Sequence, residues 1–153
     1  MDIYGWDSTE SALHAYVGAI VDAFDTRPEY TCSASTTPAS AYVALDDRLP
    51  DFPDRDLALV WDEKQGWAAA IETHSGEDLI IVSYLGGQDP VPEPRRVVRF
   101  VEKLLAGAMP GQLEPPSFPS SPDLPRKLFA AARAASTPSA RTRVTASTAA
   151  RVL

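Results

Sequence analysis

The sequence is poor in the residues that most often carry chemistry. Its 153 residues include one cysteine and two histidines. A single cysteine excludes an intrachain disulfide, and a structural zinc site needs four cysteine or histidine ligands. Cys32, His14 and His74 fall on three different predicted elements, whereas nucleophilic catalysis needs a nucleophile held against an oriented base. The sequence therefore predicts no catalytic residue, no metal site and no cofactor.

Long apolar runs are also missing. No segment reaches the roughly 18 apolar residues that a membrane-spanning helix needs. Residues 1–7 carry Asp2 and Asp7 and lack the basic and apolar regions of a signal peptide. Together with the unpaired Cys32, these features predict a cytoplasmic protein that has no membrane partner.

Positive charge is scarce outside the C-terminal tail. Residues 126–153 hold six basic side chains and no acidic one, and taking this +6 from the net charge of −7 leaves −13 on residues 1–125. An acidic body repels phosphate. We therefore expect no nucleic-acid partner, apart from weak phosphate binding through the tail. A nucleic-acid-associated accessory role through that tail is kept as an alternative.

A β-hairpin is the clearest pattern that the chain does contain. Two strand-like runs, 57–63 and 67–72, flank the peptide Lys64-Gln65-Gly66. This peptide fits a three-residue loop, in which a type I turn is followed by Gly66 in the left-handed conformation that glycine adopts without strain. The predicted pairs are Glu63 with Trp67, Trp61 with Ala69 and Leu59 with Ile71.

The loop length also decides which side chains share a face, because side chains alternate along a strand. A four-residue loop would split the two tryptophans between the faces, so the three-residue loop is preferred. One face then carries Leu57, Leu59, Trp61, Trp67, Ala69 and Ile71. The other carries Ala58, Val60, Asp62, Ala68, Ala70 and Glu72.

The remaining elements predict an α+β fold. Residues 41–45 and 79–85 read as two more strands, and the second is apolar enough to be covered on both faces. Residues 8–24 and 97–105 show the three- and four-residue spacing of amphipathic helices, the first with a capping box formed by Asp7 and Glu10. The predicted fold class is a helix, a four-stranded antiparallel meander and a helix, followed by a disordered C-terminal tail.

Composition divides the chain near residue 108. Residues 110–125 are rich in proline and serine, and residues 136–150 are mostly Ser, Thr, Ala and Arg, so neither stretch buries enough apolar surface to offset chain entropy. The expected organisation is an α+β domain over residues 5–108 and a mostly disordered Pro/Ser/Ala-rich basic tail over residues 109–153. Within that tail residues 126–133 fit a short helix, which is marginal in isolation.

Two motifs suggest binding, and each has a plainer interpretation. Five aspartates crowd one loop, as calcium ligands do, but Arg48 and Arg55 lie among them and favour a solvated, internally paired loop. The peptide from Pro122 to Lys127 fits a P-x-x-P ligand, a match that arises easily in any proline-rich linker. The five aspartates are Asp46, Asp47, Asp51, Asp54 and Asp56.

Part of the chain resembles a known family. Residues 42–50, 53–63 and 66–70 are similar to an uncharacterised actinobacterial family of small α+β proteins, catalogued as a domain of unknown function. The likeness covers roughly residues 10–107 and leaves the tail out. It implies a compact α+β domain in a bacterial cytoplasm, and it supplies no activity, cofactor or catalytic residue.

Two classes of function fit these observations. The first is a non-enzymatic protein-interaction or regulatory module, whose protein partner or second copy covers Ala58, Val60, Ala68 and Ala70. The alternative is a small-ligand-binding or enzymatic domain with a pocket between helices and sheet, lined by Tyr16, Trp61 and Trp67. A pocket with convergent polar groups would favour the second class, and a smooth apolar face the first.

Overall fold

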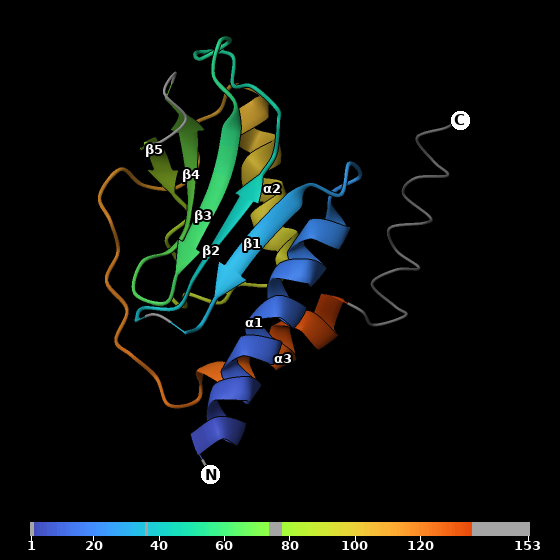
Figure 1. Ribbon diagram of the computed structural model, residues 1–153. Helices are drawn as coiled ribbons and strands as arrows, with labels where there is room; N and C mark the ends of the chain where they lie inside the picture. Colours follow the sequence, from blue (N-terminus) through green and yellow to red (C-terminus); the bar gives the residue numbers. More distant parts are fainter. Residues whose placement is uncertain (1, 36, 74–77, 136–153) are drawn as a thin grey trace.

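The computed structural model describes residues 2–35, 37–73 and 78–135, with residues 2–8 described as backbone only. Over these residues the chain forms three helices and one five-stranded antiparallel sheet, which confirms the α+β class (Figure 1). The elements are α1 (Asp2–Ala23), β1 (Glu29–Ser33), β2 (Ser40–Ala44), β3 (Leu57–Asp62), β4 (Gly66–Glu72), β5 (Leu79–Tyr84), α2 (Pro94–Leu105) and α3 (Leu124–Ala135).

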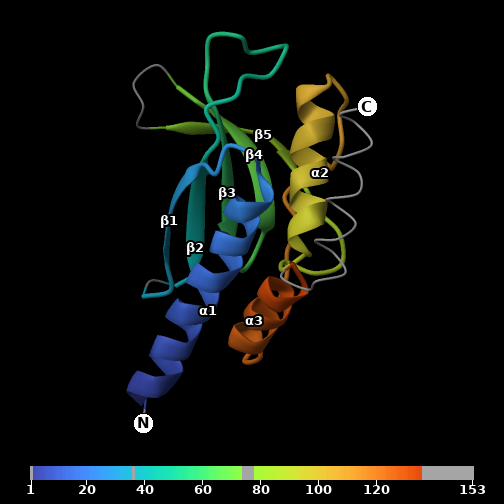
Figure 2. The same cartoon turned by 90° about the vertical axis from the view of Figure 1, so that its right-hand side faces the viewer.

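The strands follow one another in space in the order of the chain, as a meander. Within the described ranges the sheet has five strands, so the prediction of four was wrong. The additional strand, β1, pairs with β2 and turns Tyr30 and Cys32 toward the core. All three helices lie on one side of the sheet (Figure 2). No helix of the described residues lies over the other side.

The β3–β4 hairpin has the predicted faces but not the predicted register. Trp61 pairs with Trp67, and Leu59 pairs with Ala69. The predicted pairs were wrong by two residues, and because side chains repeat every two residues, this slip left every side chain on its predicted face. Gly66 has φ +72°, as predicted. The Asp62 side chain closes the turn, because its Oδ1 accepts hydrogen bonds from the backbone N–H groups of Lys64 at 2.8 Å and Gln65 at 2.7 Å.

The core lies between the sheet and the helices. Apolar side chains of α1 and α2 meet the bulky face of β2, β3 and β4, and burial of this surface is the main stabilising contribution. The largest fully buried side chains include Trp61, Trp67, Tyr16, Leu13, Ile20, Leu57, Leu59 and Ile71. Among the described residues, no helix has the length and apolar content to cross a membrane.

The helix boundaries differ at the N-terminus. α1 begins at Asp2, so Asp7 lies inside the helix and the predicted capping box was wrong. Glu10 instead joins α1 to the end of β1, because its Oε1 accepts a hydrogen bond from the Ala34 N–H at 2.9 Å. α2 confirms the second predicted helix, with Pro94 in its first turn and Gly107 at φ +92° just after its end.

Residues 109–135 pack against the rest of the chain, whereas the composition predicted no stable contacts there. Gln112 and Tyr84 exchange two backbone hydrogen bonds of 2.8 Å, and the Phe118 N–H donates to the Lys64 carbonyl at 2.8 Å. α3 then lies beside α1 and buries Leu124 and Leu128 (Figure 2). Packing of this apolar side stabilises a helix that is marginal in isolation. Residues 136–153 lie outside the described part of the chain.

β5 differs most from its prediction. Its apolar run was expected to be covered on both faces, yet Leu79, Ile80 and Ile81 are 39%, 50% and 38% exposed. The prediction was wrong because β5 is an edge strand, which has a neighbouring strand on one side only. A register shift between Ala69 and Ala70 adds one residue to β5 at Val82.

Candidate functional site

The aromatic residues of the predicted pocket meet in the core. The rings of Tyr16, Trp61 and Trp67 have centroids 6.1 to 6.4 Å apart, and none is more than 2% exposed. The Tyr16 hydroxyl donates to the Pro92 carbonyl at 2.6 Å and accepts from Trp67 Nε1 at 3.0 Å. Trp61 Nε1 donates to the Pro90 carbonyl at 2.6 Å. The three rings fill the space between helices and sheet, and burial raises the pKa of Tyr16.

The residues of the predicted interface lie together on the face that no helix covers. We call this face the open sheet face. The alternation along the paired strands assigns to it Glu29, Thr31, Ser33, Ser40, Tyr42, Ala44, Ala58, Val60, Asp62, Ala68, Ala70, Glu72, Leu79, Ile81 and Tyr84. Figure 2 shows this face turned away from all three helices.

The alanines form the floor of the open sheet face, and larger side chains stand above them. Ala58 and Ala70 are fully buried, although no helix covers them. The Tyr42 hydroxyl on β2 donates to Glu72 Oε2 on β4 at 2.7 Å, so these two side chains span β3. Burial, followed by the hydrogen bond to Glu72, raises the pKa of Tyr42 to about 12. A hollow of about 230 Å³ beside this bridge is lined by Val60, Ala68, Ile81, Tyr84, Ser40, Asp62 and Gln65.

The charges of the sheet are all of one sign. No strand carries a lysine or arginine, and the three charged strand residues are Glu29, Asp62 and Glu72. All three belong to the open sheet face. Four of the basic side chains lie instead on α2, on the other side of the sheet. The open sheet face is therefore apolar in its middle and negative around it.

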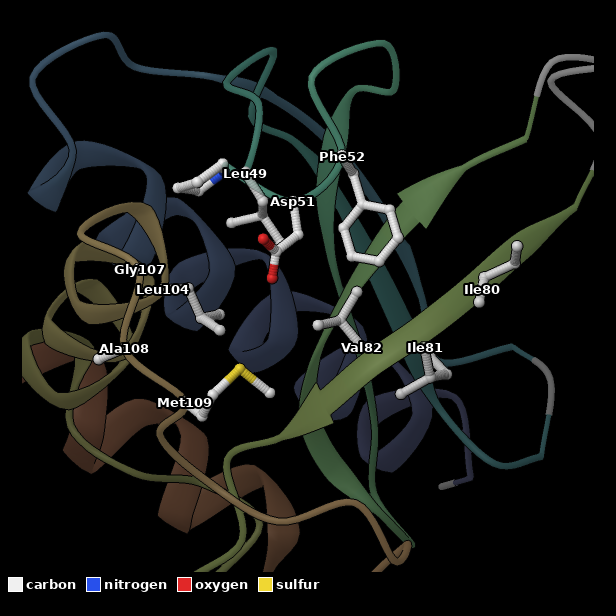
Figure 3. A pocket seen from close by; sticks show the side chains of 11 residues that line it. Leu49, Asp51, Phe52, Ile80, Ile81, Val82, Leu104, Gly107, Ala108 and Met109 are labelled. Atoms are coloured by element: carbon white, nitrogen blue, oxygen red, sulfur yellow. The ribbon is translucent and has the colours of Figure 1, made fainter.

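A second hollow, of about 300 Å³, lies on the helix side of β5 (Figure 3). Figure 3 shows Leu104 and Met109 on one side of it and Val82 and Phe52 on the other. Asp51 is the charged residue in its lining, which is completed by Leu49, Pro50, Ile80, Ile81, Gly107 and Ala108. Ile81 also lines the hollow of about 230 Å³ on the open sheet face. β5 therefore lies between the two hollows.

The residues with nucleophilic or metal-binding side chains do not assemble into a site. Burial, and then Glu10, raises the pKa of the Cys32 thiol to about 11, which keeps it protonated and weakly nucleophilic at neutral pH. His14 is exposed and contacts Glu10, 3.2 Å away, and His74 lies outside the described residues. Among the described residues no three His, Cys, Asp or Glu side chains are grouped to hold a metal.

The aspartate-rich loop is internally paired where the structure shows contacts. Arg48 Nε contacts Asp56 Oδ1 at 3.2 Å, and its Nη1 donates to the Pro53 carbonyl at 3.1 Å. The Asp47 carbonyl accepts a hydrogen bond from the Leu57 N–H at 2.8 Å. Arg48 therefore fastens the two ends of this loop to each other, as the interspersed arginines suggested.

Sequence analysis alone missed several residues of this surface. Tyr42 was not assigned to the open face, and the strand that contains Ile80 was expected to be covered on both faces. A signal was present in the composition of the final predicted strand. The run from Leu79 to Val82 has no charge, and its position at the end of a meander makes it an edge.

Comparison with known proteins gives one result. No curated protein and no solved structure matches the chain. One family model matches residues 16–103, which run from the middle of α1 through the whole sheet to most of α2 and exclude α3. This match spans more than half of the sequence and includes the residues of the predicted interface and those of the predicted pocket. The chain therefore belongs to the Family of unknown function (DUF6292).

Proposed function

We propose that the protein is a non-enzymatic protein-interaction module, which binds through its open sheet face a partner with an apolar surface rimmed by basic side chains. The observation that supports this proposal is the apolar middle of that face. An antiparallel sheet with one uncovered face normally makes that face polar. Here Val60, Ile81 and Tyr84 surround a hollow with an alanine floor, as at surfaces that other proteins cover.

The charge pattern indicates the chemistry of the partner. Glu29, Asp62 and Glu72 on the open sheet face are complemented by lysines or arginines at the rim of another protein. The same carboxylates repel nucleic-acid phosphates. They also disfavour face-to-face pairing of two copies, because like charges would meet across the interface. A basic protein surface therefore fits this face better than a nucleic acid or a second copy.

The small-ligand alternative has less support. The two hollows, of about 230 and 300 Å³, stand at or below the small end of ligand-binding sites, which span roughly 300 to 1,000 Å³. Asp51 supplies the charge in one of them. In the other, Asp62 already accepts two backbone hydrogen bonds in the β3–β4 turn. The other polar residues that line this hollow are Ser40, Gln65 and Tyr84, so its one carboxylate is already engaged by the turn.

Site-specific photo-crosslinking tests the proposal in the full chain. p-Benzoylphenylalanine replaces Val60 on the open sheet face or, as the matched control, Glu102, which is exposed on α2. Both proteins are irradiated in lysate of the source cell at 0.1 M and 0.5 M NaCl. We expect one partner to be labelled from position 60 and not from position 102, with less labelling at high salt because the charge pairs are screened.

Three outcomes would contradict the proposal. Equal labelling from both positions would mean that the contact is unspecific, and no labelling from position 60 would mean that nothing covers the face. A crosslink to residues 136–153 of the same chain would mean that the basic C-terminal residues cover the face themselves. Circular dichroism of both proteins shows that each is folded.

A further inference from the structure

The outer edge of β5 is closed along one half and open along the other. Near its end, the N–H and carbonyl of Tyr84 both bond to Gln112. Near its start, the Asp78 carbonyl accepts a bond from Thr73, so it points toward β4. Because backbone groups alternate along a strand, the N–H and carbonyl of Leu79 and Ile81 point away from β4. No described residue pairs with this open half.

This open half lacks the features with which proteins protect an edge. Exposed edge strands usually carry lysine, proline or an inward-pointing charge. Residues 79–82 read Leu-Ile-Ile-Val and include none of these. Ile80, opposite Ile71 and on the helix side of the sheet, is 50% exposed. The segment thus combines unpaired backbone groups with apolar side chains on both faces.

We propose that β5 pairs antiparallel with β5 of a second copy of this chain, with Ile80 opposite the partner's Ile80 on a two-fold axis. Leu79 then lies opposite the partner's Ile81. These residues exchange N–H to carbonyl hydrogen bonds in both directions, and symmetry repeats the exchange, which gives four bonds. The result is one continuous antiparallel sheet across both copies. This edge adjoins the open sheet face, to which the Ile81 side chain belongs, but it binds through backbone groups, and the inference goes beyond the proposed function.

Among the described residues, the positions of the backbone groups favour this register. If Ile81 were placed opposite the partner's Ile81, Leu79 would face the partner's Ser83. The N–H and carbonyl of Ser83 turn toward β4, because the bulge puts Tyr84 outward. That register would lose two of the four bonds. The two hydrogen bonds between Tyr84 and Gln112 occupy the outward backbone groups of Tyr84. Pairing between the two copies therefore cannot extend to Tyr84.

The side chains favour the same arrangement. In a non-hydrogen-bonded antiparallel pair the Cα atoms are about 4.5 Å apart, so Ile80 and the partner's Ile80 cover each other. No charged residue stands opposite another, because Asp78 faces the partner's Val82. The hollow beside Ile80, with Phe52 and Met109 in its lining, widens the contact on the helix side (Figure 3).

The size of the contact sets the expected affinity. Five residues a strand, 78–82, even with the hollow, bury less than the roughly 800 Å² per partner of a standard interface. We therefore expect a weak dimer, with a Kd on the order of 10 to 100 μM. Each copy has a net charge of −7, so salt strengthens the pairing by screening the repulsion. The opposite salt dependence is expected for the partner of the open sheet face.

A charge-swap experiment tests the register in the full chain. Ile80→Lys and Ile80→Glu are made separately, since Ile80 is half exposed and both variants should fold. Ala130→Lys and Ala130→Glu, at an exposed position of α3, are the matched controls. We expect sedimentation equilibrium to show at least tenfold weaker self-association for each Ile80 variant and none of this loss for the controls. An equimolar mixture of the two Ile80 variants should restore dimers, because Lys and Glu then meet on the axis.

Cysteine crosslinking supplies a second measurement. In a Cys32→Ser background, Ile80→Cys should form an intermolecular disulfide readily, because the two Cα atoms are within the range that a disulfide spans. Leu79→Cys should form little disulfide, because the residue opposite it is the partner's Ile81 and the partner's position 79 lies diagonally across the pair. Equal crosslinking from both positions would contradict the register.

Other outcomes would overturn the inference as a whole. The first is a wild-type chain that is monomeric at 500 μM. The second is self-association of both Ile80 variants that equals that of the wild type. The third is a mixture of Ile80→Lys and Ile80→Glu that forms no more dimer than either variant alone. A monomeric chain would leave crosslinking from position 60 unaffected. Failure of this inference is therefore distinguishable from failure of the proposed function.

Discussion

Gly66 is the residue at which a single side chain would disturb most of the hairpin. Its φ of +72° disfavours any β-branched residue, and a Cβ there would lie 3.3 Å from Phe118 Cε2 and 3.5 Å from Pro90 Cα. Gly66→Val should lower the free energy of unfolding by about 2 kcal/mol, measured by urea denaturation. Lys64→Ala, in the same turn and exposed, should change it by less than about 0.5 kcal/mol. Similar losses from both substitutions would contradict this account of the turn.

Cys32 should make stability fall at alkaline pH. Its pKa is about 11 in the folded chain against 9.0 for an unperturbed thiol, so the folded state holds the proton more tightly. This contribution is fully present below pH 9 and is lost as the pH rises toward 11. Urea denaturation at pH 8 and pH 10.5 should show a smaller decrease for Cys32→Ala than for the wild type. Parallel pH profiles would mean that the thiol titrates alike in both states.

At the residue scale, the sequence predicts faces better than pairs. Alternation fixed the face of each residue in β3 and β4, because an error of two residues does not change it. The pairing depended on where the turn begins. Asp62 joins the turn through its side chain, whereas the prediction extended the strand to Glu63. The preference of aspartate for capping turns was the available signal.

α3 is the element whose contribution is easiest to measure. Leu128 is fully buried, and Lys127 beside it is exposed. Leu128→Ala should cost about 2 to 4 kcal/mol, because it removes buried apolar atoms and leaves a cavity. Lys127→Ala should cost less than about 0.5 kcal/mol. Equal unfolding midpoints in thermal denaturation would mean that α3 is not part of the cooperative core.

Elements were predictable where their apolar pattern was strong. α2 has six apolar residues at helical spacing between residues 97 and 105, and β3 and β4 are apolar runs bounded by polar residues. β1 lacks such a pattern, because it has five residues, of which Glu29, Thr31 and Ser33 are polar and only Tyr30 and Cys32 are apolar. α3 showed a helical pattern, but only tertiary packing against α1 decides whether so short a helix forms.

Limited proteolysis tests the extent of the folded unit. Composition places its end near residue 108, whereas the contacts of Gln112, Phe118 and Leu128 continue to α3. Digestion of the full chain with a protease of broad specificity should leave a protected fragment that ends near Ala135, because cleavage needs local unfolding. Mass spectrometry identifies the end. A stable fragment that ends near Gly107 would show that residues 109–135 detach from the rest.

At the scale of the whole molecule, charge and fold class were readable and the surfaces were not. The acidic character of the body follows from counting residues. The placement of the three strand carboxylates, Glu29, Asp62 and Glu72, on one face depends on strand order and on the side that the helices occupy. The alternation of side chains along one strand determines neither the strand order nor the face that the helices cover.

The contact between α1 and α3 also has a consequence for synthesis on the ribosome. α1 is translated first and α3 last of the described elements, yet the two pack side by side (Figure 1). The nascent chain therefore carries an incompletely covered α1 until residues 124–135 have left the ribosome. During that interval its apolar side is accessible to chaperones and to other nascent chains. A premature stop before α3 would turn this temporary exposure into a permanent one.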